Sequence, residues 1–333
     1  MKELLFALSS GEGGWGGEVN EFWLIKKISA IAAKGKSKSL VKGIGDDCAV
    51  LDCGNGKFLL VSTDTFNEGV HFMREYSSFH DVGIKSVSAG ISDIYAMGGT
   101  CELVLIAISV PGNMTIQQIA AFYKGAKRVC DECGAVIAGG DTTSGIRGFS
   151  VTVTAAGFAR KRQIKYRSGA RPGDTVYLTG QVGYSLAGLM LLQKKIHSRR
   201  VENIKALLTH RAPRPFIHRL ALDGITSMID ISDGLSSELN HLAHASGVKI
   251  RLEPELLFRD QGLYRLSQQL GVNIETLVLN SGEEYALLYT GRTGLAGRHA
   301  IPIGRVEKGE SGVVRIVGNR EKRIAAGGYV HCL

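Results

Sequence analysis

The stretch Gly43-Ile44-Gly45-Asp46-Asp47-Cys48-Ala49-Val50 joins two glycines, two adjacent carboxylates and the beginning of an apolar run. Glycine lets a backbone turn tightly, and an apolar run after such a turn is typical of a strand. A single aspartate in this setting is commonly a turn residue or a helix cap. The same order of residues nevertheless returns at Asp64, Asp93, Asp141, Asp230 and Asp233. Five separated segments with one pattern favour a site for several metal ions.

Length and composition place the chain among globular proteins. Its 333 residues predict about two domains, and 44% hydrophobic with 21% charged residues is ordinary for a globular chain. No apolar run approaches the roughly 18 residues that span a bilayer, so we expect no membrane partner. The first ten residues lack a convincing cleavage site, and we therefore expect no signal peptide and a cytoplasmic location.

The six cysteines do not form a disulfide framework. They lie at positions 48, 53, 101, 130, 133 and 332, which is too irregular a spacing. Cys130 and Cys133 form a C-x-x-C inside a helical pattern, without the second pair of ligands that zinc needs. We predict two reduced, partly buried thiols there rather than a zinc site.

The net charge of +9 permits an anionic partner, either a nucleic acid or a phosphorylated small molecule. Much of the excess lies between Lys194 and Arg219. Aromatic residues are almost absent among these cations, and stacking on aromatic side chains is typical of single-strand binding. We therefore predict a solvated helical face and no nucleic-acid partner.

Periodicity in the first half predicts helices and strands that meet at the acidic residues. A strand over 57–61 is expected to end at Ser62, Thr63 and Asp64, the place where open sheets present their chemistry. Another strand, over 135–138, is expected to end at Gly139-Gly140-Asp141. The other predicted elements are helices over 18–33 and 81–97, strands over 103–110 and 149–155, and a helix that starts at the capping box of Thr115 and Gln118 and ends near Gly134.

A basic, loop-like segment at 160–172 separates this half from the next. We place the domains at 1–158 and 159–333. The second half repeats the order of apolar strand, acidic turn and helix, most clearly where a strand over 228–231 leads into Asp230-Ile231-Ser232-Asp233-Gly234. Its other predicted elements are strands over 175–179, 248–252, 285–289, 301–306 and 312–317, and helices over 183–192, 235–242 and 262–270.

The carboxylates suit magnesium, a hard cation that takes oxygen ligands from a few acids and from substrate phosphates. The sequence contains no G-x-x-x-x-G-K-[ST] loop and no H-R-D or D-F-G signature. If the chain uses ATP, metals and glycine backbone must hold the phosphates. His71 and Arg167 each have two interpretations, because a lone histidine or loop arginine is usually structural or solvated, yet both suit a phosphate.

Taken together, the motifs resemble those of the thiamine-monophosphate kinase family, over nearly the whole chain from about residue 18. The order matches at Gly45-Asp46-Asp47, Ser62-Thr63-Asp64, Glu68-Gly69-Val70-His71-Phe72, Ser92-Asp93, Gly139-Gly140-Asp141-Thr142, Arg167-Ser168-Gly169-Ala170, Asp230-Ile231-Ser232-Asp233-Gly234-Leu235 and Gly282-Glu283. The family lies within a superfamily of aminoimidazole-ribonucleotide-synthetase-like ATP enzymes. The resemblance implies two α/β domains and a homodimer joined through the N-terminal mixed sheet and its helices.

The resemblance also implies a reaction in which ATP phosphorylates thiamine monophosphate to thiamine diphosphate. It assigns magnesium ligands to Asp47, Ser62, Thr63, Asp64, Asp93, Asp141, Asp230 and Asp233. It assigns ATP contacts to Tyr123, Gly140, Asp141, Arg167 and Ser232. It assigns contacts with thiamine phosphate to His71, Glu283 and Tyr329. We expect no general base, because a phosphate monoester with a second pKa near ~6 is already largely ionised at neutral pH.

Two positions depart from the pattern that the resemblance implies. Ser281-Gly282-Glu283-Glu284 stands where the family commonly has Gly-Gly-Glu-Asp, which puts the local geometry in question. Tyr329 stands where the family usually has Trp or Phe, and it adds a hydroxyl to a ring that could still stack. Three rival interpretations remain at this point: another ATP enzyme of the superfamily, a basic nucleic-acid-binding protein, and a non-catalytic metal-binding dimer.

Overall fold

The computed structural model describes residues 21–32, 37–216, 220–295 and 299–329. The predicted start of the first helix at residue 18 and Cys332 lie outside these ranges. Within them, every helix is too short or too polar to span a membrane.

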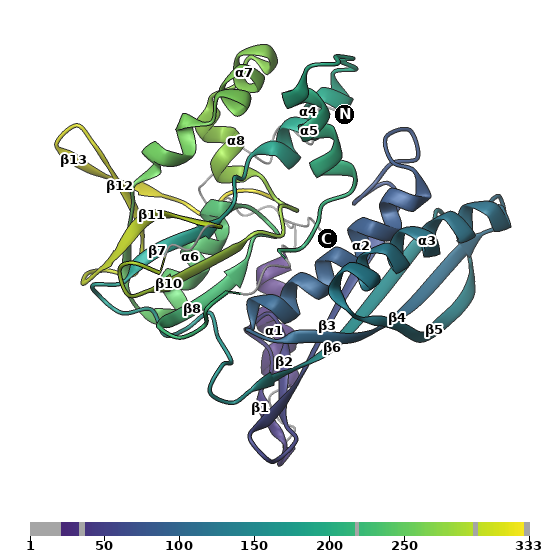
Figure 1. Ribbon diagram of the computed structural model, residues 1–333, viewed down its shortest axis with the longest axis horizontal. Helices are drawn as coiled ribbons and strands as arrows, with labels where there is room; N and C mark the ends of the chain where they lie inside the picture. Colours follow the sequence, from purple (N-terminus) through teal and green to yellow (C-terminus); the bar gives the residue numbers. More distant parts are fainter. Residues whose placement is uncertain (1–20, 33–36, 217–219, 296–298, 330–333) are drawn as a thin grey trace.

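The N-terminal part of the chain builds a six-stranded mixed sheet with the order β1-β2-β3-β6-β4-β5 (Figure 1). β3 and β6 pair over their whole length, from Lys57 opposite Arg160 to Asn67 opposite Ser150. The strands are β1 (Leu40–Lys42), β2 (Ala49–Asp52), β3 (Lys57–Asn67), β4 (Thr100–Pro111), β5 (Val136–Gly145) and β6 (Ser150–Arg160).

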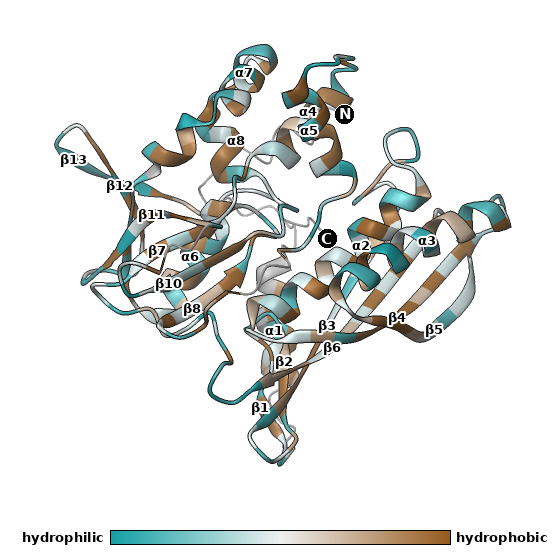
Figure 2. Cartoon of the chain, viewed as in Figure 1, coloured by the Kyte–Doolittle hydropathy of each residue, from teal (hydrophilic) through white to brown (hydrophobic). Residues whose placement is uncertain are grey.

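Two long helices cover one face of this sheet (Figure 1). Both α2 (Phe79–Ala96) and α3 (Ile116–Cys133) start with a capping box, formed by Ser78 with Asp81 and by Thr115 with Gln118. α2 is buried along most of its length, whereas α3 carries hydrophobic and hydrophilic segments (Figure 2). The first helix of the described chain is α1 (Glu21–Ala32). The core of this part therefore lies between α2, α3 and the sheet.

The C-terminal part builds a seven-stranded sheet with the order β13-β12-β9-β11-β7-β10-β8. Its strands are β7 (Thr175–Thr179), β8 (Ile225–Asp230), β9 (Lys249–Leu252), β10 (Leu287–Gly291), β11 (Ala300–Glu307), β12 (Gly312–Val317) and β13 (Arg320–Ile324). Its helices are α4 (Tyr184–Gln193), α5 (Val201–Arg211), α6 (Leu235–Ser246), α7 (Gln261–Leu270) and α8 (Ile274–Asn280), with a short 3₁₀ turn η1 (Pro254–Arg259). The leucines of α6 lie in a core of their own, together with residues of α4, α7 and the sheet.

The predicted α/β class is confirmed, but two strand ends in the first half were wrong. β3 continues to Asn67, so Ser62 and Asp64 lie inside a strand and not after it. β5 likewise continues through Gly140 and Asp141 to Gly145. Both strands run on because each has a partner for its backbone along its whole length, β6 for β3 and β4 for β5. The predicted strand over 285–289 starts two residues later, at Leu287.

The predicted boundary at 158/159 falls within the last residues of β6, and the second sheet starts at Thr175. Helix α2 contacts β8 of the second sheet, so the acidic end of β8 lies against α2. This contact brings the two halves of the chain together at their acidic residues.

Candidate functional site

Three buried or half-buried carboxylates meet where the two halves of the chain touch. Asp47 follows the glycine turn at 43–45, Asp93 lies in the last turn of α2, and Asp230 ends β8. One oxygen of each lies within 4.8 Å of the others. Asp64, on β3, lies against α2 at Gly90, where a side chain would come within 3.7 Å of its Oδ2. A Cβ at Gly90 would also lie 3.3 Å from the Ala155 Cβ, so α2 packs closely on the sheet beside Asp64.

Serine and arginine side chains hold these carboxylates in place. Ser62 Oγ donates to Asp93 Oδ2, and Ser92 Oγ donates to Asp230 Oδ2 at 2.6 Å. Arg167 donates to Asp47 Oδ1 through Nε at 3.1 Å and through Nη2 at 2.6 Å. The arginine comes from the segment between the two sheets, so this charge-assisted pair also joins the two halves of the chain.

Asp46, next to Asp47 in the chain, has partners outside the three-carboxylate cluster. Its Oδ1 accepts from the backbone N–H of Arg167 at 3.0 Å, and its Oδ2 lies 3.4 Å from Lys42 Nζ. These contacts fix the turn before β2. Asp46 therefore has the features of a turn residue, and Asp47 those of a site residue.

Burial makes the cluster hard to ionise. It raises the pKa of Asp47 to about 7, although Arg167 opposes the shift, and it raises the pKa of Asp64 and of Asp230 to about 6. Burial and then the neighbouring carboxylates Asp64, Asp230 and Asp47 raise the pKa of Asp93 well above its usual range. Like charges this close destabilise one another unless a cation lies among them.

Two features test whether a metal ion fits these residues. Asp47 Oδ2 and Asp64 Oδ2 are buried and have no hydrogen-bond partner among the described residues. Carboxylate and hydroxyl oxygens are also the ligands that Mg²⁺ prefers. Both the unsatisfied oxygens and the chemistry of the donor set therefore fit a divalent cation.

A second group of side chains extends the site along α2. Lys85 Nζ donates to the backbone carbonyl of His71 at 3.0 Å and lies 2.7 Å from Glu283 Oε2. Tyr285 is buried in the N-terminal core although it belongs to the C-terminal half. Burial and the charges of Glu283, Asp64, Asp230 and Asp93 raise the pKa of the Tyr285 phenol well above its usual range. Tyr285 is thus close enough to both Glu283 and the acidic cluster for their charges to act on it.

The loop after Asp230 is fixed by a side chain of α6, the helix that follows it. The buried carboxylate of Glu238, on α6, accepts from the backbone N–H groups of Ser232, Asp233 and Gly234 at 2.8–3.2 Å. These amides are the donors that a helix N-terminus would otherwise offer to an anion. Glu238 therefore fixes the loop and occupies its amides.

The C-terminal segment that carries Tyr329 docks onto this loop. The Tyr329 N–H donates to the Asp233 carbonyl at 3.1 Å, and Ser236 Oγ donates to the Gly327 carbonyl and accepts from its N–H, both at 3.1 Å. Gly328 has a φ of +118°, and a Cβ there would lie 2.2 Å from the Asp233 carbonyl oxygen. The segment can approach the loop this closely only with glycine at that position.

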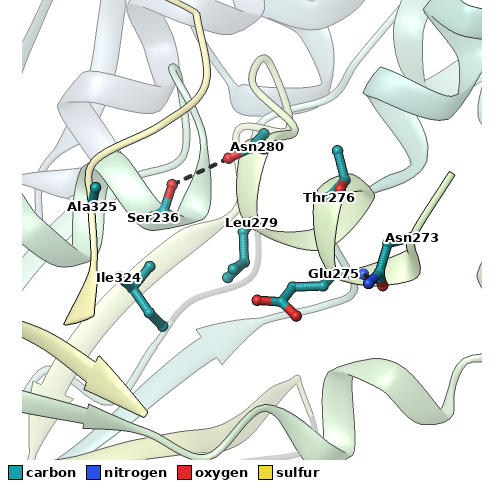
Figure 3. A pocket seen from close by; sticks show the side chains of 8 residues that line it. All are labelled: Ser236, Asn273, Glu275, Thr276, Leu279, Asn280, Ile324 and Ala325. Atoms are coloured by element: carbon teal, nitrogen blue, oxygen red, sulfur yellow. Dashed lines mark hydrogen bonds between the residues drawn. The ribbon is translucent and has the colours of Figure 1, made fainter. Parts of the chain in front are cut away.

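Beside this segment lies a cavity of about 170 Å³ between α6, α8 and the end of β13 (Figure 3). Ser236 and Asn280 point toward one another across it, with Ser236 Oγ 3.5 Å from Asn280 Oδ1. None of the site residues predicted from the sequence lines this cavity. It borders the segment of Tyr329 and stands apart from the acidic cluster.

Comparison with known proteins places this geometry in a family. Residues 45–159 match the model of the AIR synthase related protein N-terminal domain, and residues 171–317 match that of the C-terminal domain. The chain is 36% identical to the thiamine-monophosphate kinase of Bacillus subtilis (strain 168) over 277 residues, which cover 82% of this chain and 83% of the relative. It is 35% identical to that of Aquifex aeolicus (strain VF5) over 301 residues, 88% of this chain and 93% of the relative. The chain belongs to the thiamine-monophosphate kinase family.

Solved structures agree with this assignment. A structure of AaThiL complexed with AMPPCP and TMP superposes with a TM-score of 0.84 at 32% identity and covers 96% of this chain and 100% of that one. Thiamine-monophosphate kinase from Stenotrophomonas maltophilia K279a gives a TM-score of 0.71 at 28% identity, covering 90% and 98%. E. coli HypE, at 17% identity and a TM-score of 0.67, shares the fold alone.

The structure does not bring all the residues that the family pattern selects into one cluster. Thr63 alternates with Ser62 and Asp64 and therefore points to the opposite face of the sheet, where its hydroxyl lies 3.1 Å from that of Thr154. Asp141 is exposed on β5 opposite Ala107 of β4. Three strand spacings, about 14 Å, separate β5 from β3 in the order of the sheet. Tyr123, half-buried on α3, and Gly140 lie toward the same edge.

The two departures from the family pattern at 281 and 284 form one contact. Ser281 Oγ donates to Glu284 Oε1 at 2.6 Å and accepts from the Leu186 N–H at 2.9 Å. Glu284 Oε1 also accepts from the N–H groups of Gly183 and Ser185 at 2.7 and 3.0 Å. The pair therefore caps the start of α4 together. Ser281 and Glu284, whose local geometry the sequence put in question, thus belong to a helix cap. Glu283 points to the N-terminal half instead.

Four side chains of the site were missed from the sequence: Lys85, Ser92, Glu238 and Tyr285. Two of them left a signal. Lys85 is the only charged residue between Asp81 and Asp93, and Glu238 is the only one between Asp233 and His241. A single charged side chain in a stretch of apolar or small residues is expected to be buried, and a buried charged side chain needs a partner. Ser92 stands in the Ser92-Asp93 motif, which gave the serine no role, and Tyr285 left no signal; the partners of both come from the other half of the chain.

Proposed function

We propose that this chain transfers the γ-phosphoryl group of ATP to thiamine monophosphate and so forms thiamine diphosphate. The observation that carries the proposal is the meeting of Asp47, Asp93 and Asp230 from both halves of the chain, with the buried Oδ2 of Asp47 lacking a hydrogen-bond partner among the described residues. Family membership supplies the substrates, since relatives named thiamine-monophosphate kinase match most of the chain.

We assign the residues of the site to metal binding, ATP binding and substrate binding. Asp47, Asp64, Asp93 and Asp230 would hold magnesium, with Ser62 and Ser92 orienting two of these carboxylates. When bound, magnesium would neutralise charge on the transferring phosphoryl group. Arg167 and Ser232 are proposed to contact ATP, and His71, Glu283 and Tyr329 to contact thiamine phosphate. The attacking phosphate oxygen is ionised at neutral pH, so these residues act by alignment rather than by proton transfer.

We further propose a homodimer formed through the face of the N-terminal sheet opposite α2 and α3. Thr63 and Thr65 on β3 pair with Thr154 and Thr152 on β6 on that face, where the first two are exposed and the last two half-buried. Leu105 adds an exposed apolar side chain. A second copy would cover this face and with it Thr63 and Asp141, so these two predicted magnesium ligands would lie at the dimer interface, whereas Asp233 lies in the loop after β8.

The test supplies magnesium-ATP and thiamine monophosphate to the purified chain and measures thiamine diphosphate. The proposed function predicts formation of the diphosphate with one ADP per product, and loss of product when magnesium is chelated. ATP binding without this product would instead favour another enzyme of the superfamily. Magnesium binding without any ATP turnover would favour a non-catalytic dimer.

The nucleic-acid alternative has less support from the basic lobe between Lys194 and Arg219. Lys205 Nζ lies 3.5 Å from the centroid of the Tyr184 ring, and Arg214 Nη1 lies 2.6 Å from Glu132 Oε2. Two of its cations therefore have partners within the chain. Steeply salt-dependent binding to duplex or single strands would favour this alternative.

A further inference from the structure

The ammonium of Lys85 is the feature of the site that neither the family pattern nor the proposed metal cluster accounts for. Lys85 is 2% exposed, in the middle of α2. A buried ammonium is unfavourable unless a carboxylate and further hydrogen bonds compensate for its lost water. Here the compensation comes from the Glu283 carboxylate and the His71 carbonyl, which belong to different halves of the chain.

The two partners of Lys85 share a role in the proposed reaction. His71 and Glu283 are two of the three residues proposed to contact thiamine phosphate. They lie 212 positions apart in the sequence, and the described structure joins them through one nitrogen atom. On α2, Lys85 lies eight residues before Asp93, about 12 Å along the helix. A single helix thus carries the residue that holds the substrate contacts and a proposed metal ligand.

The backbone at Glu283 and Tyr285 has an unfavourable conformation that turns both side chains toward the N-terminal half. Glu283 and Tyr285 have φ angles of +56° and +49°, a conformation unfavourable for residues other than glycine. Between them, Glu284 points back to the start of α4, while Glu283 and Tyr285 point to the N-terminal half. Alternate side chains of this loop therefore contact different halves of the chain. The one that pairs with Lys85 is Glu283.

We propose that Lys85 is a positioning residue, which fixes the Glu283 carboxylate and the His71 backbone so that both meet thiamine phosphate. The ion pair uses Oε2 of Glu283, and Oε1 is the oxygen that we propose for the substrate. Thiamine phosphate offers an amino group on its pyrimidine ring and a cationic thiazolium, and either is complementary to a carboxylate oxygen. This inference rests on the proposed function.

The test compares Lys85→Met, Glu283→Gln and the double variant, with Lys127→Met on the exposed face of α3 as the control. Each single variant is expected to raise the KM for thiamine phosphate at least about tenfold and to leave the KM for ATP within about twofold, because one charge-assisted contact is lost at one substrate only. The double variant is expected to raise this KM little beyond that of the worse single variant, since both changes break the Lys85–Glu283 pair and Lys85→Met adds only the loss of the His71 contact. The control is expected to match the wild type.

A merely structural lysine would give a different result. A KM for thiamine phosphate within about twofold of wild type in Lys85→Met, or single effects that multiply in the double variant, would overturn the positioning role. If Lys85→Met does not fold, the double variant is used in its place, because it leaves neither charge of the pair buried without a partner. Its KM for thiamine phosphate is then compared with that of Glu283→Gln. A KM for thiamine phosphate within about fivefold of that of Glu283→Gln then supports the proposal, and a larger rise overturns it. Failure of the wild type to form thiamine diphosphate would instead overturn the proposed function.

Discussion

Asp93 is the residue at which function and stability are expected to separate most clearly. Its carboxylate lies among three others, and burial with their charges raises its pKa well above the usual range. Asparagine has the same volume and can still accept the hydrogen bond from Ser62. We predict that Asp93→Asn lowers kcat/KM at least about hundredfold, because a metal ligand is lost. We predict a change in Tm of less than about 3 °C, or a rise.

The measurement pairs steady-state kinetics with thermal unfolding in the same buffer. Asp131→Asn is the matched control, since Asp131 is exposed on α3 and pairs only with Lys127 within the described contacts. Equal losses of activity and folding in Asp93→Asn would show that Asp93 is a structural residue.

Ser281 should behave in the opposite way, because its hydroxyl contacts a helix cap and not the acidic cluster. We predict that Ser281→Ala lowers the free energy of unfolding by about 1–3 kcal/mol, since it leaves the Leu186 N–H and part of the Glu284 carboxylate unsatisfied. Denaturant unfolding measures this loss, with the exposed Ser37→Ala as the control. An unchanged free energy of unfolding would mean that Ser281 and Glu284 do not act together.

At the scale of the element, α2 and α3 pack through a pair of glycines. A Cβ at Gly125 would lie 1.9 Å from the His80 carbonyl oxygen, and one at Gly83 would lie 2.0 Å from that of Phe122. Because the clashing atoms belong to the backbone, no side chain can turn away to make room. The close approach of α3 therefore fixes α2, the helix that carries Lys85, Ser92 and Asp93.

Gly125→Ala sets two effects against each other. Alanine favours a helix over glycine by about 1 kcal/mol, whereas overpacking against backbone costs about 1–3 kcal/mol or more. With a separation of 1.9 Å the clash dominates, and we predict a lower Tm by at least about 3 °C. Gly112→Ala is the control, because a Cβ there meets no atom within 4 Å. A Tm of Gly125→Ala at or above the wild-type value would contradict the packing described here.

At the scale of the whole molecule, local patterns predicted more of the fold than of the site. Amphipathic periodicity and capping residues were sufficient for α2, α3 and α6, because those signals lie within one element. The extent of β3 could not be predicted, since Ser62 and Asp64 are polar and are tolerated in the strand only because β6 pairs with it to the end. The meeting of Asp47, Asp93 and Asp230 could not be predicted either, because it depends on how the two halves of the chain pack together.

The residues that the sequence could not place are those whose partners come from a distant segment. Of the ligands that the family resemblance assigns, Asp47, Asp93 and Asp230 converge, whereas Thr63 and Asp141 face away from them, and the sequence could not reveal this difference. Their roles as ligands remain predictions. Lys85 illustrates the same limit, because its partner Glu283 becomes a neighbour only when the two domains are assembled.

The acidic cluster also predicts how the whole chain responds to pH when no metal is bound. A carboxyl group whose pKa is raised by folding contributes stability that is fully present below its unfolded pKa and is lost as pH rises through its folded pKa. For Asp47 the folded value is about 7, and for Asp64 and Asp230 about 6. The metal-free chain should therefore become more stable as pH falls from 8 to 6.5.

The predicted gain in stability is limited to the range above pH 6.5, because two buried histidines oppose it at lower pH. Burial lowers the pKa of His241 to about 4 and that of His210 well below its usual range, so below pH 6.5 their protonation favours the unfolded chain. Each proton that the folded chain takes up stabilises it by up to about 1.4 kcal/mol per pH unit. We predict a rise in Tm of about 4–8 °C from pH 8 to 6.5 in the presence of a chelator, measured by thermal unfolding.

Magnesium should reverse this pH dependence, because a cation among the ionised carboxylates replaces the protons that they would otherwise take up. Added magnesium is therefore expected to raise Tm more at pH 8 than at pH 6.5, and Asp93→Asn should reduce both the pH dependence and the magnesium effect. A metal-free chain that becomes less stable between pH 8 and 6.5 would mean that the cluster is not the dominant titrating site. A magnesium effect that is equal at the two pH values would mean that the ion binds elsewhere.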